Sequence, residues 1–197
     1  MESLIVREIE IDEIIESIKV FLLAFNRMNS EAVENEKKTW ECLIQKKIAH
    51  FYIALLNGKI IGVGGAFVYR NVGSLGYLGV LPEYRGVGVG TAIFKALLES
   101  AINLGCETVM LYASELGEPI YRKFGFQGTY YASNLSLIKK WPKISIKNKQ
   151  IEIIDYLPDW LLRLDEKAVG YDRSDYLQVR MILGAKILGI EEEGYGL

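Results

Sequence analysis

Residues 75–98 read LGYLGVLPEYRGVGVGTAIFKALL. The apolar run ends at Pro82, and after Arg85 every second residue from 86 to 90 is glycine. An amphipathic helix is predicted to follow at once, because apolar residues recur at helical spacing as far as Leu104. Backbone N–H groups at the start of a helix, unobstructed by side chains, form an anion site together with the positive end of the helix dipole. The segment therefore predicts a strand, an anion-binding loop and a helix.

The spacing of these glycines excludes two common phosphate-binding loops. A P-loop ends in Gly-Lys-Ser/Thr, whereas Gly90 is followed directly by Thr91. A dinucleotide fingerprint needs a third glycine three residues after the second, within regularly alternating strands and helices, and this chain has neither feature. Two interpretations remain: another kind of pyrophosphate loop, or a glycine-rich turn between strand and helix that happens to carry an arginine.

The pattern Arg85-x-x-Gly88-x-Gly90, placed after an apolar run and Pro82, resembles the pyrophosphate loop of the GNAT superfamily of acyl-CoA-dependent N-acyltransferases. A second segment, ETVMLYASELGEPIYRKFGF at 107–126, reads as a buried strand, a loop and a short helix. It ends in a match to the Tyr-x-x-x-Gly-Phe signature of the same superfamily, with the tyrosine at Tyr121. Either motif alone is weak, but both in the right order indicate this superfamily.

The order of predicted elements agrees with this resemblance. From residue 3 to 140 it runs strand, two helices, three antiparallel strands, helix, strand, short helix and strand, with a hairpin turn at Asn57-Gly58. The resemblance implies an α/β protein of the α+β type with the GNAT fold. Its central sheet is expected to be mixed, mostly antiparallel and flanked by helices. We expect residues 1–140 to form this acetyltransferase domain.

Residues 141–197 are expected to form a small α/β extension. One or two strands are predicted within Ile144–Leu157, a helix from Asp159, and a further helix over Asp175–Ile190 that Gly184 interrupts. Part of this segment resembles the opening of a second GNAT-like domain. Two interpretations stay open for the extension: a partial second domain of that kind, or an oligomerisation element.

Composition limits the class of protein. The chain has 197 residues, of which 50% are hydrophobic, enough for one domain and an appendage. A net charge of −2 provides no basic field for nucleic acid or an anionic membrane. One histidine and no cysteine–histidine cluster argue against a metal site, and no apolar run reaches membrane-spanning length. We expect a cytoplasmic protein with no metal, nucleic-acid or membrane partner, in which Cys42 and Cys106 are free thiols.

The resemblance implies acetyl-CoA as the cosubstrate and places it on the first motif. The strand that ends at Val80 would pair its open edge with the pantetheine arm, and the glycine-rich loop would hold the pyrophosphate. Ser114 stands where many family members carry an asparagine, and its hydroxyl either replaces that cofactor contact or caps the turn. The cofactor-binding residues implied are Leu78, Gly79, Val80, Arg85, Gly86, Val87, Gly88, Val89, Gly90, Thr91 and Ser114.

Tyr121 is the expected general acid, because by resemblance its phenol lies near the sulfur and protonates the departing thiolate. Its alternative is a tyrosine of the core. The general base stays open, since the strand at 74–80 contains no carboxylate. A chain of waters is one alternative to the candidate glutamates. Those candidates are Glu31, Glu34, Glu36, Glu115 and Glu118.

The acceptor is expected between the first two helices and the last strands, where Phe25, Trp40, Tyr130 and Tyr131 occur beside glutamates. Such walls suit a cationic amine, but the same residues are ordinary core and surface material. Polyamines, aminoglycosides, amino-acid derivatives and protein N-termini all stay open as acceptors. The leading interpretation is an N-acetyltransferase that transfers the acetyl group of acetyl-CoA to a primary amine of a small molecule or peptide, with a homodimer as one expected assembly. The alternative is a catalytically idle CoA-binding regulatory module. A nucleotide-binding domain is disfavoured by the missing P-loop lysine.

Overall fold

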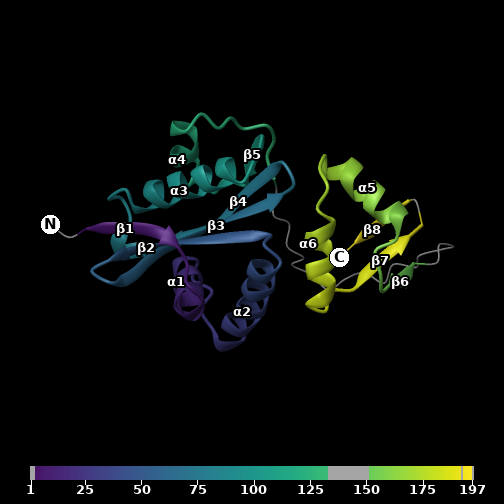
Figure 1. Ribbon diagram of the computed structural model, residues 1–197, viewed down its shortest axis with the longest axis horizontal. Coiled ribbons are helices and arrows are strands. Elements are labelled where there is room, and N and C mark those ends of the chain that lie inside the picture. Colours follow the sequence, from purple (N-terminus) through teal and green to yellow (C-terminus); the bar gives the residue numbers. More distant parts are fainter. Residues whose placement is uncertain (1–2, 133–150, 192, 197) are drawn as a thin grey trace, which may run out of the picture.

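The computed structural model describes residues 3–132, 151–191 and 193–196, which form two units (Figure 1). The first unit contains, in chain order, β1 (Leu4–Glu8), a 3-10 turn (Ile11–Glu13), α1 (Ile14–Ala24), α2 (Ser30–Gln45), β2 (Ala49–Leu56), β3 (Lys59–Tyr69), β4 (Val72–Val80), a second 3-10 turn (Pro82–Tyr84), α3 (Val89–Asn103), β5 (Thr108–Leu111) and α4 (Glu118–Lys123). The second contains β6 (Glu152–Ile154), α5 (Asp159–Val169), α6 (Ser174–Ile182), β7 (Ile187–Ile190) and β8 (Gly194–Gly196).

The sheet of the first unit has the strand order β1-β2-β3-β4-β5. The first four strands pair antiparallel, and β5 joins β4 in parallel. Helices α1 and α2 cover one face, and α3 and α4 lie on the other (Figure 1). The expected mixed, mostly antiparallel sheet flanked by helices is therefore confirmed.

Glycines in β3 determine how closely α3 approaches the sheet. A Cβ added at Gly64 would lie 2.7 Å from Leu97 Cδ1 and 2.9 Å from Ile93 Cγ2, so these α3 side chains rest directly on the strand backbone. Both leucine and isoleucine are fully buried there. This contact fixes α3 over the sheet. The N-terminus of α3 follows the end of β4 after a short connection.

The other face buries an aromatic cluster. Trp40 of α2 is 0% exposed and stacks on Phe51 of β2 with 3.8 Å between the ring centroids. Tyr77 of β4 meets the edges of both rings. The aromatic cluster anchors α2 to β4, the strand that forms part of the candidate site described below.

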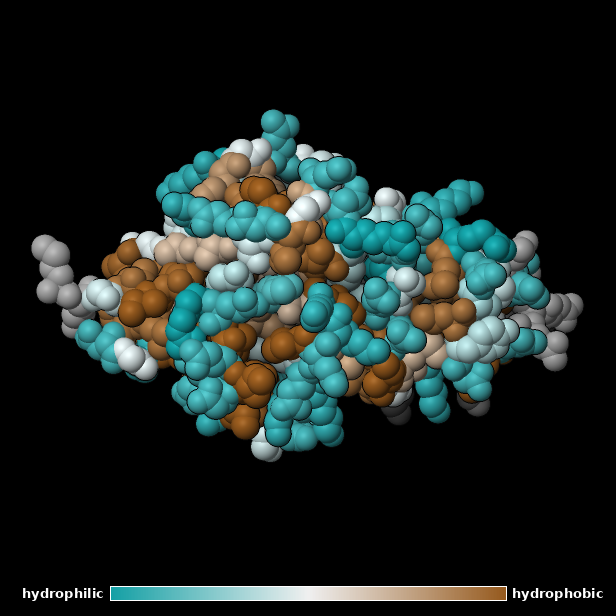
Figure 2. All heavy atoms as spheres, viewed as in Figure 1, coloured by the Kyte–Doolittle hydropathy of each residue, from teal (hydrophilic) through white to brown (hydrophobic). Residues whose placement is uncertain are grey.

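On the molecular surface, charged and polar side chains cover most of the face shown in Figure 2, while apolar residues gather over β1 and β2.

The second unit repeats the opening topology of the first. Strands β6, β7 and β8 form an antiparallel sheet in that order, with both helices between its first two strands, as α1 and α2 lie between β1 and β2. The helix predicted from Asp159 is confirmed. The helix predicted over Asp175–Ile190 is wrong beyond Ile182. Gly184 adopts φ +90° and ends the helical turn, and the alternately buried β7 follows.

Helix α6 joins the two units. Val179 is buried within the main core of the first unit, and Tyr171 stacks on Tyr69 of β3 with centroids 5.4 Å apart. Arg70 forms an ion pair with Asp172 at the same junction. The predicted strand at 126–140, the break at 141–142 and the domain boundary between them fall mostly outside the described residues. Within the described part of the chain, no helix is long and apolar enough to cross a membrane.

Candidate active site

Strand β4 separates from β5, the last strand of the described sheet. They pair only between Val72–Leu75 and Thr108–Leu111. Beyond Leu75, β4 continues to Val80 beside β3 alone, so no strand of the described chain pairs with its other edge. The backbone N–H and C=O groups of that edge, at Leu78, Gly79 and Val80, are those that the GNAT resemblance assigns to the pantetheine arm.

A β-bulge lies at the point of separation. Gly76 pairs with Gly65 of β3 and Gly79 with Val63, so two residues of β4 oppose one of β3. Tyr77, within the bulge, adopts φ +55°. Such a conformation is uncommon for a bulky residue, and bulges re-aim side chains next to active sites. Here the bulge turns the phenol ring into the aromatic cluster under α2.

The turn after β4 presents a row of free backbone N–H groups. Gly86 and Gly88 adopt φ +80° and +94°, and a Cβ added at either would meet no heavy atom within 4 Å. None of the N–H groups from 86 to 91 donates a hydrogen bond to another group in the described part of the chain. Because α3 starts at Val89, the positive end of its dipole acts on the same space. The loop therefore has the donors that a pyrophosphate requires.

Arg85 ties this loop to the domain. Its Nε donates to the carbonyl of Val80 at 2.9 Å, and its Nη2 donates to the carbonyl of Ala24 at 2.7 Å. The exposed guanidinium thus joins the ends of β4 and α1 to the loop. Its predicted contact with the pyrophosphate stays a prediction, and the geometry gives Arg85 a positioning role besides its charge.

Tyr121 lies on α4, against the ring of Phe94 at 4.8 Å between centroids. It packs on the same core cluster as Leu78 and Val80 of β4. Burial raises the pKa of Tyr121, and its hydroxyl donates no hydrogen bond within the described part of the chain. The phenol therefore keeps a proton at neutral pH that is free for donation, as its predicted role requires.

Ser114 caps the turn before α4. Its hydroxyl accepts a hydrogen bond from the N–H of Gly117 at 3.2 Å, and its carbonyl accepts from the N–H groups of Gly117 and Glu118. This arrangement supports the capping interpretation of Ser114. The alternative, a contact with the cofactor, stays a prediction.

A cavity of about 750 Å³ lies on the α2 face, where β4 and β5 separate. Its floor comes from β3, β4 and β5, and α2 and the second unit form its walls. The lining residues include Thr39, Tyr69, Tyr77, Met110, Tyr112, Tyr130, Tyr171, Arg173, Tyr176 and Arg180. Its volume suits a small molecule. Helix α3 and the glycine-rich loop at its N-terminus lie on the opposite side of the sheet from α2 (Figure 1).

Comparison with known proteins identifies this arrangement. A model of the acetyltransferase (GNAT) family matches residues 16–126, which hold the open edge of β4, the glycine-rich loop and Tyr121. The chain belongs to the GNAT acetyltransferase family. As a member of that family it is an acyl-CoA-dependent acyltransferase.

Solved structures agree with this assignment. A protein from Pyrococcus horikoshii assigned as an acetyltransferase is 29% identical over 100% of this chain and 68% of that one, with a TM-score of 0.83. A predicted acetyltransferase from Clostridium acetobutylicum, solved with acetyl-CoA, is 21% identical over 69% of this chain and 97% of its own, with a TM-score of 0.59. Glucosamine-6-phosphate N-acetyltransferase from Arabidopsis thaliana is 19% identical over 68% and 99%, with a TM-score of 0.55. The last two show the GNAT fold alone.

The structure brings only one of the four aromatic residues expected around the acceptor to the cavity. Trp40 is fully buried, and its Nε1 donates to Glu36 at 3.1 Å, so its ring belongs to the core and is unavailable to a substrate. Tyr131 is fully exposed, and Phe25 is partly exposed beside Phe21 at the end of α1. Of the four aromatic residues expected, only Tyr130 lines the cavity. The other aromatic walls come from residues that no local pattern singled out.

Among the candidate bases, Glu36 stands apart. Burial raises the pKa of Glu36, against hydrogen bonds from Trp40 and Tyr77 that lower it. Because Tyr77 lines the cavity, this carboxyl is linked to the cavity through one side chain. The remaining candidates are exposed: Glu31, Glu34, Glu115 and Glu118. No group of three or more potential metal ligands occurs in the described part of the chain.

Proposed function

We propose that this chain transfers the acetyl group of acetyl-CoA to a primary amine of a small molecule or peptide. The observation that carries the proposal is the row of free N–H groups from 86 to 91, which begins six residues beyond the open end of β4 at Val80. Amides at a helix start bind phosphate oxygens, and an open strand edge binds the amides of an extended chain. The two features together fit the pyrophosphate and pantetheine of an acyl-CoA.

The proposed acyl transfer needs one side-chain proton donor and backbone N–H groups. The neutral amine attacks the thioester carbonyl carbon, a C–N bond forms, and the C–S bond breaks. The amine loses one proton, which passes to solvent, and the thiolate gains one. Tyr121 supplies that second proton from its phenol and regains it from solvent. N–H groups at the open edge of β4 stabilise the charge that develops on the carbonyl oxygen.

The test measures CoA affinity by calorimetry and thiol release from acetyl-CoA with a panel of amines. Charge-assisted hydrogen bonds contribute about 1.5–3 kcal/mol each, so Arg85→Ala is expected to weaken CoA binding roughly tenfold or more. Lys38→Ala is the control, because it removes an exposed cation of α2, whose Nζ lies 3.6 Å from Glu34, on the opposite face of the sheet. CoA binding without thiol release from any amine would indicate the idle regulatory module. If Arg85→Ala keeps its fold and its affinity for CoA is unchanged, the proposal that this loop binds the pyrophosphate is wrong.

A further inference from the structure

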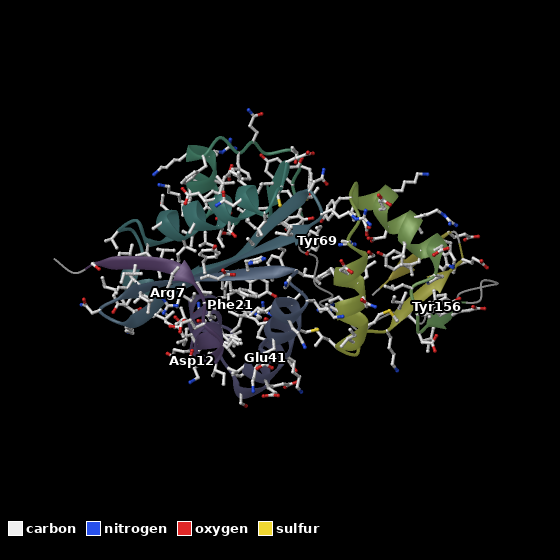
Figure 3. The ribbon with its side chains drawn as sticks, in the orientation of Figure 1. Arg7, Asp12, Phe21, Glu41, Tyr69 and Tyr156 are labelled. Carbon is white, nitrogen blue, oxygen red and sulfur yellow. The ribbon has the colours of Figure 1, made fainter. Side chains whose placement is uncertain are left out.

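The second unit forms one wall of the acceptor cavity. Figure 3 shows Tyr69 at the end of β3, facing this unit, and the rings of Tyr171 and Tyr176 pack on it at 5.4 and 6.1 Å between centroids. These contacts hold the start and the first turn of α6 against the sheet. Arg180 follows on the same helix and lines the cavity together with Tyr77 of the β4 bulge. Side chains of α6 and of the separated strands therefore line one and the same cavity.

The charged side chains that line this cavity are both arginines, Arg173 and Arg180. Arg173 is already neutralised. Its Nε and Nη2 donate to both carboxylate oxygens of Asp165 at 2.9 and 2.8 Å, and Asp165 is 3% exposed. Arg180, in contrast, has no carboxylate within 4 Å of its guanidinium in the described part of the chain. A half-buried cation without a counter-ion is costly, and an anionic ligand removes that cost.

The tyrosines of the cavity add hydrogen-bond donors. Burial raises the pKa of Tyr69 and Tyr77 well above the ordinary value, and that of Tyr171 also rises through burial. These phenols therefore stay protonated and neutral at any physiological pH. A neutral phenol donates readily to an anion, and its ring supplies an apolar wall for the carbon chain between two charged ends.

We propose that the acceptor of this enzyme is an amine that also carries an anionic group, a carboxylate or a phosphate, and that Arg180 binds this group. The proposal rests on the proposed function and specifies its substrate class. The amine is directed to the separated edges of β4 and β5, and the anion is held at α6 by a charge-assisted pair with the guanidinium. The second unit is then a specificity element of the acceptor site. Among the acceptor classes that the sequence left open, this favours amino-acid derivatives over purely cationic amines, because the cavity is lined by arginines and no acidic side chain of the described chain lines it.

Matched pairs of amines test this proposal. The two members of each pair share the amine, and only one of them carries an anionic group. The pairs are 4-aminobutyrate and propylamine, and O-phosphoethanolamine and ethanolamine. Thiol release gives kcat and KM for each, and calorimetry on CoA-saturated protein measures binding without turnover. The anionic member of at least one pair is expected to have a kcat/KM at least tenfold higher and to bind correspondingly tighter. The pair that responds distinguishes carboxylate from phosphate recognition.

The variants separate Arg180 from general effects. Arg180→Gln is expected to abolish the preference through KM and to remove the calorimetric signal of the anionic amine, and Arg180→Lys is expected to restore part of both. Lys186→Gln, an exposed cation of the same unit outside the cavity, should keep the preference. Equal binding of both members of each pair, or an undiminished preference in a folded Arg180→Gln, would overturn the proposal. If CoA binds but no amine yields thiol, the proposed function fails, while the calorimetric comparison still decides whether the cavity binds anions.

Discussion

Gly88→Ala should weaken both CoA binding and the fold, whereas the same change at Gly105 should weaken the fold alone. Gly88 precedes the first residue of α3 and adopts φ +94°. Gly105 lies just beyond the other end of the same helix and adopts φ +87°. A Cβ at either position would meet no heavy atom within 4 Å. The two glycines therefore present the same backbone strain at opposite ends of one helix, and Gly105→Ala is the matched control.

The expected loss of stability follows from that strain. An L-residue in the left-handed region costs roughly 1–2 kcal/mol, and neither new methyl group meets a clash in the free protein. For a chain of this size, each kcal/mol lowers Tm by about 2–4 °C. Both variants are therefore expected to melt about 2–8 °C below the wild type, with closely similar shifts.

The ligand separates the two variants. A methyl group at Gly88 extends into the open space beside the free N–H groups, where the pyrophosphate is predicted to lie. Displacing one phosphate–amide contact removes a charge-assisted hydrogen bond of about 1.5–3 kcal/mol, so the Kd for CoA should rise roughly 10- to 150-fold. Gly105→Ala should leave that Kd within about twofold, because affinity changes only through sites that touch the ligand or its loop.

Thermal melts and calorimetric titration with CoA measure both quantities on the same samples. The reasoning is refuted if Gly88→Ala keeps wild-type affinity while its melting temperature falls, since the turn would then be only a strand-to-helix connection. Equal losses of affinity in both variants would point instead to a general loosening of α3.

Three further predictions concern other groups. Tyr121→Phe should lower kcat about 10²–10⁴-fold with little change in CoA affinity, because the ring packing survives and only the proton donor is lost; wild-type turnover would leave thiolate protonation to water. Asp165→Asn should destabilise the protein by about 1–3 kcal/mol in urea unfolding, because it leaves the Arg173 guanidinium without its counter-ion, and an unchanged unfolding midpoint would contradict this. Burial raises the pKa of Glu36, so its contribution to stability is fully present below the ordinary glutamate pKa and is lost as the pH rises through the raised value. Glu36→Gln should therefore be the more stable protein at neutral pH and should flatten the dependence of stability on pH, which urea titrations across mildly acidic to neutral pH measure against the wild type.

Local features of the sequence were sufficient to indicate the family and the fold, and they placed the predicted cosubstrate site on the loop after β4. The glycines after Arg85, the Asn57-Gly58 hairpin and the signature ending at Phe126 each act through backbone geometry within a few residues. Their order along the chain was enough to indicate a GNAT domain. Helix propensity alone wrongly predicted a helix after Gly184. That segment contains strand β7, which is held by its pairing with β6 and β8.

Local sequence patterns could not predict which residues line the cavity. Trp40 reads equally well as a cavity wall or as core, and its stacking on Phe51 decided for the core. Arg180 has no motif around it, and it lines the acceptor cavity only because α6 packs against β3 from a distant part of the chain. Local backbone preferences act over a few residues, whereas a cavity is formed by side chains that meet only when the chain folds back on itself. The residues of the glycine-rich loop could therefore be singled out from the sequence, whereas those that line the cavity were found only in the folded structure.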